Sequence, residues 1–548
     1  MWRLSFLLPF LTPCFAKTIT LDWDISWVSA SPDGYTRPVI GVNGQWPCPG
    51  IEADVGDTIV VNVKNSLGNE TTGIHWHGMY QQGTISMDGA SEMTQCPIPP
   101  GSTFTYTFTA YPAGSYWWHA HNHGQYPDGL RGPMIIHDRR LENSYEASSE
   151  FTMTVSDWYH DQMPYLLHSY LGPDNPNGIE PIPNSCIVND AASTIIPIRS
   201  REKLLLRIIN IGALAHLFVQ FDSHQLTVVA VDSIPVRPRT VDGIRISPGQ
   251  RYDVLITGKP YATRNYGLIT RMDTAIFKAN SSSSKLNCNG ILSYSAKLSN
   301  PPPLRTTEFS LADDITFQPT DNQPLLEPVD QTITYNPKLI YYPNIGPRIA
   351  LGDAPYHHQK VPTLYTALTT GTSATNPAVY GKGVQPTVLR AGKVIQIVVN
   401  NADTAAHPMH LHGHHFQVVG RGSGTWNGVV DVNQWGGLSP GVRRGPMRRD
   451  TVDVPPNGWV VIRFKAERPG IWLFHCHIEF HVEAGMTTTF IEAPELLQTI
   501  SHPKIPDDHI QVCKLQNRPT EGNCAGKKGQ DVLDTRECEE GPKEAGWG

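Results

Sequence analysis

The chain contains the stretch His475-Cys476-His477-Ile478-Glu479-Phe480-His481, and Met486 follows Cys476 by ten residues. On an extended strand, neighbouring side chains point to opposite faces, and residues two apart share a face. His475 and His477 are therefore expected to face one way and Cys476 the other. One thiolate with two imidazoles and a weak thioether forms a blue-copper electron-transfer site. The stretch thus predicts two adjacent copper centres, one holding Cys476 and the other its two flanking histidines.

Three further segments supply more histidines at the same spacing. With 22 histidines among 548 residues, chance predicts roughly one His-x-His pair, yet six occur. A single pair is more often a solvent-facing or hydrogen-bonded strand pair, and zinc also binds histidine and cysteine. Zinc sites, however, use about four ligands, so the whole set favours copper. The segments are His75-Trp76-His77, His119-Ala120-His121 and His407-Pro408-Met409-His410-Leu411-His412.

Strand parity divides these residues between two sites. His410 and His412 share a face, whereas His407 lies three residues before His410 and faces the side expected for Cys476. The predicted mononuclear site therefore holds His407, Cys476 and His481, with Met486 as its axial neighbour. The predicted three-copper cluster is held by His75, His77, His119, His121, His410, His412, His475 and His477.

These segments resemble the ligand motifs of the multicopper oxidases over nearly the whole chain. The resemblance implies four copper ions: one type 1, one type 2 held by His75 and His410, and a type 3 pair held by the other six cluster histidines. It also implies that one-electron oxidations of a donor are coupled to reduction of O2 to water. Three sequence segments are most similar to those of fungal iron-oxidising members of the family. They are Ser86-Met87-Asp88-Gly89, Trp158-Tyr159-His160-Asp161 and Glu180-Pro181-Ile182-Pro183.

Short runs rich in β-branched and aromatic residues, bounded by glycine or proline, predict an all-β chain. Examples are 58–63, 104–108 and 394–399, and the chain has 47 glycines and 46 prolines. Together with the resemblance, this predicts three cupredoxin-like Greek-key β-sandwich domains. Copper segments occur only in the first and third, so the cluster is expected to bridge them. The predicted bounds are 17–140, 150–297 and 324–495, followed by a polar cysteine-containing tail at 496–548.

Composition and the N-terminus indicate an exported protein. The formal charge is -7 without a long basic run, which argues against nucleic-acid binding. Residues 1–16 combine a basic start, an apolar run and a small residue at the end, as a secretory signal peptide does. No later stretch has the roughly 20 apolar residues of a membrane helix. We therefore expect secretion, to the medium or the cell wall, without a membrane anchor.

Cysteine use fits an oxidising compartment. Of nine cysteines, Cys14 falls in the signal peptide and Cys476 is a predicted copper ligand, which leaves seven. Because seven is odd, at least one lacks an intramolecular partner. The resemblance implies that Cys96 pairs with Cys513. Sequons at Asn69 and Asn280 allow N-glycosylation.

Two carboxylates are candidates for proton chemistry beside the cluster. Glu479 lies between predicted ligands His477 and His481, and Asp88 follows the first histidine pair. A carboxylate near a copper cluster should have a depressed pKa and can orient water or relay protons. The resemblance assigns both residues such a role, although Asp88 also suits a turn in Met87-Asp88-Gly89.

The electron donor is the least determined feature. Fungal ferroxidases bind Fe(II) with three carboxylates, and two matching residues are present, Glu180 and Asp403. At the third position, after Asp273-Thr274, the chain reads Ala275-Ile276-Phe277, and apolar residues there suit an aromatic substrate. A thioether from Met486 would also lower the copper potential. We therefore expect a laccase-type oxidase of phenolic substrates, acting in pigment or secondary-metabolite synthesis. The alternatives are a soluble ferroxidase and, from another class, a copper-storage or structural cupredoxin.

Overall fold

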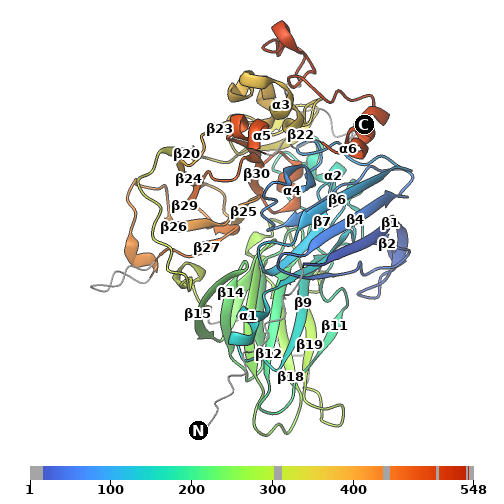
Figure 1. The fold of residues 1–548 in the computed structure, drawn as a ribbon. Coiled ribbons are helices and arrows are strands. Elements are labelled where there is room, and N and C mark those ends of the chain that lie inside the picture. Colours follow the sequence, from blue (N-terminus) through green and yellow to red (C-terminus); the bar gives the residue numbers. More distant parts are fainter. Residues whose placement is uncertain (1–15, 302–310, 436–444, 501–504, 539–540, 542–548) are drawn as a thin grey trace, which may run out of the picture.

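The computed structural model describes residues 16–301, 311–435, 445–500, 505–538 and 541. Apart from Ala16, the predicted signal peptide lies outside the described residues. Three β-sandwiches make up most of the chain, so the all-β prediction is confirmed. In Figure 1 the second sandwich, in green, lies below the first, in blue, and the third, in orange and red.

The first sandwich consists of two four-stranded sheets. Its strands alternate between buried and more exposed residues, and in β4 the side chains of Ile59, Val61 and Val63 are buried. This alternation is typical of a strand with one face on a core. One sheet has the order β2 (Arg37–Val42), β1 (Thr18–Ala30), β4 (Thr58–Asn65), β6 (Thr103–Thr109), and the other has the order β3 (Ile51–Asp54), β8 (Arg131–His137), β7 (Gly114–Ala120), β5 (Ile74–His77).

The second sandwich has a six-stranded and a five-stranded sheet. The disulfide between Cys186 in β10 and Cys288 in β19 joins the two sheets. The six-stranded sheet has the order β10 (Ser185–Val188), β9 (Ser149–Trp158), β12 (Lys203–Asn210), β17 (Arg251–Thr257), β14 (Leu226–Val231), β15 (Ile234–Val241). The five-stranded sheet has the order β11 (Ser193–Pro197), β19 (Asn287–Ser293), β18 (Tyr266–Met272), β13 (Leu217–Phe221), β16 (Gly243–Ile246).

The third sandwich has two five-stranded sheets and a separate hairpin, β21 (Lys338–Tyr342) with β22 (Gly346–Ala350). One sheet has the order β20 (Gln331–Tyr335), β24 (Val394–Asn401), β29 (Gly458–Lys465), β26 (Phe416–Ser423), β27 (Arg448–Arg449). The other has the order β23 (Pro386–Leu389), β31 (Thr487–Glu492), β30 (Gly470–Cys476), β25 (His407–Leu411), β28 (Thr451–Val454).

Short helices connect and cover the sheets. Helix α2 follows the first strand of the second sandwich, and α4 begins three residues after β30 ends. Helix α6 packs on β6 of the first sandwich, where the carboxylate of Asp508 accepts a hydrogen bond from the backbone N–H of Thr105. The α-helices are α1 (Arg139–Ser144), α2 (Met163–Leu171), α3 (Thr363–Thr369), α4 (Glu479–Glu483), α5 (Pro494–Ile500) and α6 (Asp507–Leu515).

The first and third sandwiches share one continuous apolar core. Trp118 of the first and Phe474 of the third belong to the same cluster of buried side chains, whereas Leu206 and Val254 belong to a separate cluster in the second. Burial of apolar area is the dominant favourable term in folding and association. The first and third sandwiches are therefore held together as one body, which fixes the strands that carry the histidines.

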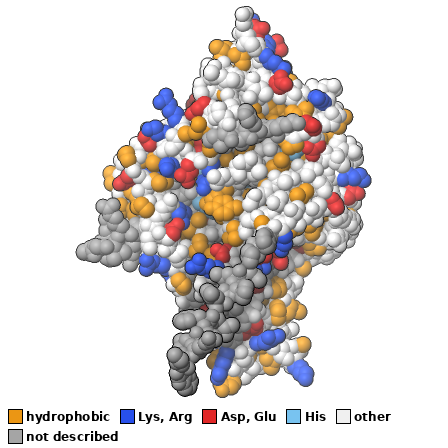
Figure 2. Space-filling view, viewed as in Figure 1, with side chains coloured by type: hydrophobic (Ala, Val, Ile, Leu, Met, Phe, Trp, Pro, Cys, Tyr) orange, Lys and Arg blue, Asp and Glu red, His pale blue; other side chains and the backbone are white. Residues whose placement is uncertain are grey.

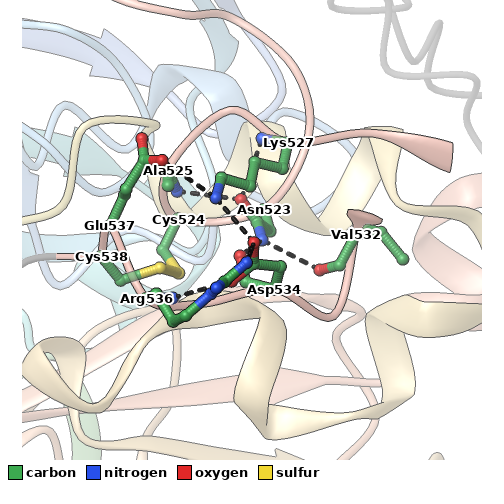
Figure 3. The surroundings of a disulfide bond; sticks show 9 residues. All are labelled: Asn523, Cys524, Ala525, Lys527, Val532, Asp534, Arg536, Glu537 and Cys538. Carbon is green, nitrogen blue, oxygen red and sulfur yellow. Dashed lines mark hydrogen bonds and ion pairs between the residues drawn. A yellow bond between two sulfur atoms is a disulfide. The ribbon is translucent and has the colours of Figure 1, made fainter. Parts of the chain in front are cut away.

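One disulfide attaches the C-terminal segment to this body, and a second lies within the segment. Cys96 pairs with Cys513 of α6, as the resemblance implies. A second bridge joins Cys524 to Cys538, and beside it the side-chain amide of Asn523 donates to the carbonyls of Val532 and Asp534 at 2.9 and 2.8 Å (Figure 3). Within the described residues, Cys48 and Cys476 are the cysteines without a disulfide, and both are buried.

Acidic and basic side chains are interspersed on the face shown in Figure 2. Such mixing does not create the extended positive field that attracts a phosphate backbone. Across the described part of the chain, every helix is too short or too polar to cross a lipid bilayer.

Replacing Cys96 and Cys513 together by serine is expected to lower the thermal midpoint markedly. The two residues are separated by 417 positions, so the bridge removes much entropy from the unfolded chain, about 4 kcal/mol or more in a chain-entropy account. Calorimetry would measure the shift. The control is the same replacement at Cys524 and Cys538, which are 14 positions apart. That bridge is expected to stabilise the fold by about 3 kcal/mol or less. Wild-type melting of the Cys96 and Cys513 variant would contradict the prediction.

Candidate copper centres

A cysteine and two histidines of the third sandwich converge at one buried point. Cys476 is the last residue of β30, His407 the first of β25, and His481 lies in α4. The Cys476 sulfur is 3.4 Å from Nδ1 of His481 and 3.8 Å from Nδ1 of His407, and these two nitrogens are 3.2 Å apart. Met486 is fully buried, and its backbone contacts both Cys476 and His481. The structure therefore brings together His407, Cys476 and His481 of the predicted mononuclear set, with the backbone of Met486 beside them.

Carboxylates on the outer side of these two rings orient them. The Nε2 atom of His481 donates to Glu180 at 2.8 Å, and Nε2 of His407 lies 3.5 Å from Asp403. A proton held on Nε2 leaves a lone pair on Nδ1, since a neutral imidazole has one donor and one acceptor nitrogen. Two lone pairs and a sulfur thus face each other, an arrangement that a cation between them stabilises.

Two cross-strand histidine pairs form the centre of the predicted cluster. His75 of β5 lies opposite His119 of β7 in the first sandwich, and His410 of β25 lies opposite His475 of β30 in the third. The remaining four cluster histidines lie at or just beyond the ends of these strands. Contacts join the sandwiches, because the His75 ring stacks on His412 with centroids 4.0 Å apart. Groups within ligand distance of one another are His75, His77 and His119; His75, His410 and His412; and His121, His412 and His475.

Backbone and carboxylate acceptors hold the Nδ1 protons of several cluster histidines. His75 donates to the carbonyl of Asp88 at 2.7 Å, His119 to Ala120 at 2.9 Å and His410 to Asp450 at 2.9 Å. Their Nε2 atoms are buried and have no hydrogen-bond partner among the described residues. Buried polar atoms are rarely left unpaired in proteins. These unpaired nitrogens fit metal ligation by three of the eight predicted cluster histidines, His75, His119 and His410.

Burial also lowers the pKa of six of the eight cluster imidazoles and so favours their neutral form. Burial and neighbouring imidazoles hold the pKa of His77, His119, His412, His475 and His477 well below the ordinary value, and lower that of His121 to about 3. Burial raises the pKa of the Cys476 thiol. Metals bind neutral imidazole and thiolate, so these six imidazoles favour the form that binds a metal, whereas the Cys476 thiol must lose a proton when its site is filled. The donor set of imidazoles with one thiolate fits copper.

Asp88 lies against two of the cluster histidines. Its Oδ2 accepts a hydrogen bond from Nδ1 of His412 at 2.9 Å, and its Oδ1 is 3.4 Å from Nδ1 of His75. Burial acts to raise the pKa of Asp88, but the two histidines outweigh it and hold the pKa below the ordinary value. Asp88 is therefore an ionised buried group that fixes the ring orientation of two predicted ligands.

Glu479 differs from Asp88 in the direction of its pKa shift. It is buried at the start of α4, and burial together with the neighbouring carboxylate of Glu483 raises its pKa well above the ordinary value. The expectation of a depressed pKa is thus met by Asp88 and not by Glu479. The sequence prediction missed Glu483, because one helical turn in α4 brings it beside Glu479 and no strand pattern signals that pairing.

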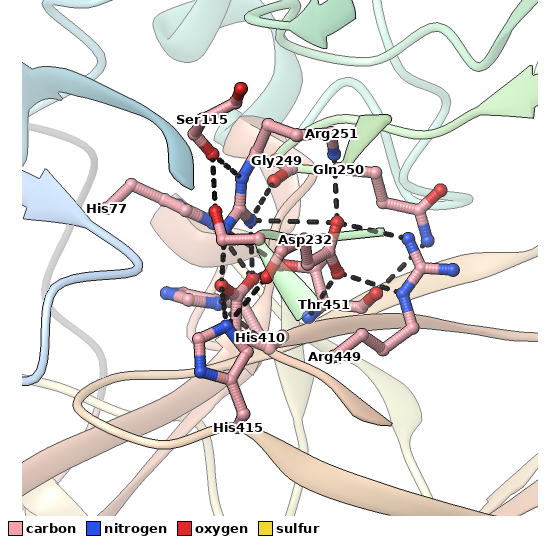
Figure 4. A network of polar contacts seen from close by, with 12 residues as sticks. His77, Ser115, Asp232, Gly249, Gln250, Arg251, His410, His415, Arg449 and Thr451 are labelled. Atoms are coloured by element: carbon pink, nitrogen blue, oxygen red, sulfur yellow. Dashed lines mark hydrogen bonds and ion pairs between the residues drawn. The ribbon is translucent and has the colours of Figure 1, made fainter. Parts of the chain in front are cut away.

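The second sandwich, which carries no predicted ligand, nevertheless braces the cluster (Figure 4). Asp450 accepts hydrogen bonds from Arg251 at 2.7 and 2.6 Å and lies 3.3 Å from Nε2 of His77. Asp232 of the second sandwich in turn accepts from Arg449 of the third at 2.9 Å. At Gly249, where φ is +83°, an added Cβ would lie 2.8 Å from the His477 ring. Sequence reasoning missed these residues, since none lies near a copper segment in the chain.

The third position beside Glu180 and Asp403 is charged and not apolar, which corrects the sequence expectation. Ile276 is buried in the core, and Phe277 packs against the same cores. The next residue, Lys278, places its ammonium 3.3 Å from Glu180 and 3.0 Å from Asp403. Ala275-Ile276-Phe277 therefore does not supply the apolar wall expected for an aromatic substrate.

Family models described as multicopper oxidase match three parts of the chain. They cover residues 24–141, 149–297 and 356–496, and so include all the predicted ligand segments.

Curated relatives match the chain along most of its length. The iron transport multicopper oxidase fetC of Epichloe festucae is 43% identical over 526 residues, 95% of this chain and 83% of the relative. The iron transport multicopper oxidase FET3 of Gibberella zeae is 41% identical over 95% of this chain and 83% of the relative. The iron transport multicopper oxidase FET3 of Saccharomyces cerevisiae is 36% identical over 93% of this chain and 81% of the relative.

Solved structures give the same picture. The crystal structure of Fet3p, titled a multicopper oxidase that functions in iron import, superimposes with a TM-score of 0.89 at 34% identity, covering 96% of this chain and 99% of that one. The laccase of Botrytis aclada superimposes with a TM-score of 0.77 at 26% identity, covering 92% of each chain.

Replacing Cys476 by serine is expected to abolish the blue absorption of the copper-loaded protein and its turnover of every reductant, because the thiolate ligand is lost. Absorption spectroscopy and O2 uptake would measure both. The matched control is Cys48→Ser, which removes the other buried free thiol of the described residues and should leave the blue colour intact. Wild-type turnover by the Cys476 variant would contradict the assignment of Cys476 as a copper ligand.

Removing copper with a chelator is expected to lower the thermal midpoint of the intact protein. The predicted cluster draws ligands from the first and third sandwiches, so binding stabilises their association. Copper at a thousand times its dissociation constant contributes about 4 kcal/mol per site. Calorimetry of the copper-loaded, chelated and reloaded protein would measure this. Equal midpoints for all three would contradict a cluster shared by two sandwiches.

Proposed function

This protein belongs to the multicopper oxidase family, whose members are oxidoreductases that pass electrons to O2, and within it we propose that the protein is a ferroxidase that oxidises Fe(II) to Fe(III). The observation that carries the proposal is a pair of carboxylates, Glu180 and Asp403, placed against the outer nitrogens of His481 and His407. Hard cations prefer oxygen ligands, and carboxylates favour Fe(III) over Fe(II).

The expectation of a laccase-type phenol oxidase in pigment or secondary metabolism is wrong. Relatives at 36–43% identity are named iron transport multicopper oxidases, and Fet3p superimposes more closely than the Botrytis laccase. The copper-storage alternative fails as well, because the family consists of oxidases. We propose an iron-related role, in line with the names of these relatives.

The residues provide a short path from the donor side to the cluster. Copper, when bound, supplies the one-electron redox chemistry and the site of O2 reduction. Glu180 contacts His481, His481 contacts the sulfur of Cys476, and Cys476 is bonded through its backbone to His475 and His477. Each step is a hydrogen bond, a buried contact or a covalent link, so an electron taken from a cation at Glu180 has a direct route inward.

Proton supply is the second requirement of the reaction. Four Fe(II) ions, one O2 and four protons give four Fe(III) ions and two waters, so each turnover consumes protons at the cluster. Glu479 is buried and the neighbouring Glu483 is partly buried, and the pKa values of both carboxyls are raised, that of Glu483 to about 7. A carboxyl that is protonated near neutral pH can donate a proton. We assign proton delivery to this pair, and orientation of the histidines to Asp88.

We also propose that the protein acts outside the cell. The support is the predicted signal peptide at 1–16 and the three disulfides among the described residues, which persist in an oxidising compartment.

Replacing Glu180 by glutamine, or Asp403 by asparagine, is expected to lower kcat/KM for Fe(II) by about 10- to 100-fold, because each change removes a charged oxygen ligand beside a copper histidine. O2 uptake with Fe(II) as donor would measure this, at four Fe(II) per O2. The control Glu467→Gln removes an exposed carboxylate of the third sandwich and should leave the rate unchanged. Absence of any Fe(II)-dependent O2 uptake by the copper-loaded wild type would contradict the proposed function.

A further inference from the structure

An ammonium group occupies the place between the two carboxylates that face the mononuclear centre. The Lys278 Nζ atom lies 3.3 Å from Oε1 of Glu180 and 3.0 Å from Oδ2 of Asp403. The same Oε1 accepts from His481, and the same Oδ2 faces His407. Every carboxylate oxygen that touches a mononuclear-site histidine is therefore also in contact with Lys278.

The loop that carries Lys278 is held by several contacts. Asp273 caps the 3₁₀ turn η2 (Thr274–Ile276) by accepting from the backbone N–H of Ala275 at 3.0 Å. Asp273 also pairs with Arg245 at 2.9 Å, and Arg245 reaches Asp453 of the third sandwich. These contacts anchor the turn that ends two residues before Lys278, and the fold thereby places this lysine within reach of the two carboxylates.

Charge and exposure favour a cation at this point. Glu180 is 3% exposed, and its Oε2 atom is buried without a hydrogen-bond partner among the described residues. Two carboxylates carry a charge of −2, and one ammonium leaves −1 uncompensated. The side chains of Lys278 and Asp403 are 28% and 31% exposed, so the position opens to solvent on that side. A dication from solvent can reach it, and the lysine can move out the same way.

We propose that Lys278 is a specificity-determining residue, an internal cation that occupies the metal-binding position between Glu180 and Asp403 and that Fe(II) must displace before it is oxidised. This rests on the proposed function. An ammonium cannot give up an electron. In the metal-binding position it therefore only competes with the electron donor. Displacement breaks two ion pairs, and this cost weakens Fe(II) binding and raises KM without changing the route from His481 to the cluster.

The test compares Lys278→Gln with wild type, Lys278→Arg and Lys297→Gln. Gln removes the competing charge, Arg keeps it, and Lys297 is an exposed lysine of the same sandwich region. Calorimetric titration of the copper-loaded proteins with Mn(II), without O2, measures dication affinity directly. We expect Lys278→Gln to bind Mn(II) about tenfold more tightly, equivalent to about 1.4 kcal/mol. Lys278→Arg and Lys297→Gln should bind as the wild type does.

Steady-state kinetics with Fe(II) supply the second readout. The expected result for Lys278→Gln is a KM about tenfold lower with kcat nearly unchanged, equivalent to about 1.4 kcal/mol. Unchanged blue absorption shows that the copper centres are intact. Equal Mn(II) affinity of Lys278→Gln and wild type overturns the inference, and does so even if Fe(II) is a substrate. If Lys278→Gln binds Mn(II) more tightly but the copper-loaded protein never oxidises Fe(II), the inference that Lys278 occupies a metal-binding position is supported. Only the proposed function is then overturned.

Discussion

The alternation of side chains around Cys476 is the constraint on which the rest of the structure depends. A thiol that faces one centre while both neighbouring imidazoles face another requires an extended backbone, which β30 and its antiparallel pairing with β25 provide. The same pairing sets His410 opposite His475 and Met409 opposite Cys476. A register slip of one residue would exchange the two faces and separate both ligand sets, so the sheet must hold this register.

The three sandwiches contribute differently to holding the ligand strands in place. The first and third share an apolar core, so the histidine pairs of β5 with β7 and of β25 with β30 are brought together by hydrophobic burial. The second sandwich keeps its own core and contacts the cluster through polar groups, chiefly Arg251 bound to Asp450. Buried ion pairs of this kind add little net stability but specify one geometry. The second sandwich therefore orients a cluster to which it contributes no predicted ligand.

The sequence predicted what depends on local periodicity. The all-β fold and the grouping of His407 with Cys476 follow from residues on one strand face, and both appear in the structure. Lys278, Asp450 and Glu483 were missed, since each reaches its site from another sandwich or through a helical turn. The error at Phe277 has the same origin: a linear pattern does not show that this ring turns into the core while the next residue faces the carboxylates.

The extent to which each residue is buried also explains how one protein scaffold can oxidise different electron donors. Cys476 and the cluster histidines are buried, except for the partly buried His121, and acceptors fix most ring orientations, so a change at any of them disturbs packing, charge and metal together. Lys278 and Asp403 are about one-third exposed, where a substitution disturbs the packed core less than it does at a buried ligand. Charge at the donor position can therefore change at small cost to folding. Under the proposed function, donor preference depends on these few groups, while the electron path beneath them stays the same.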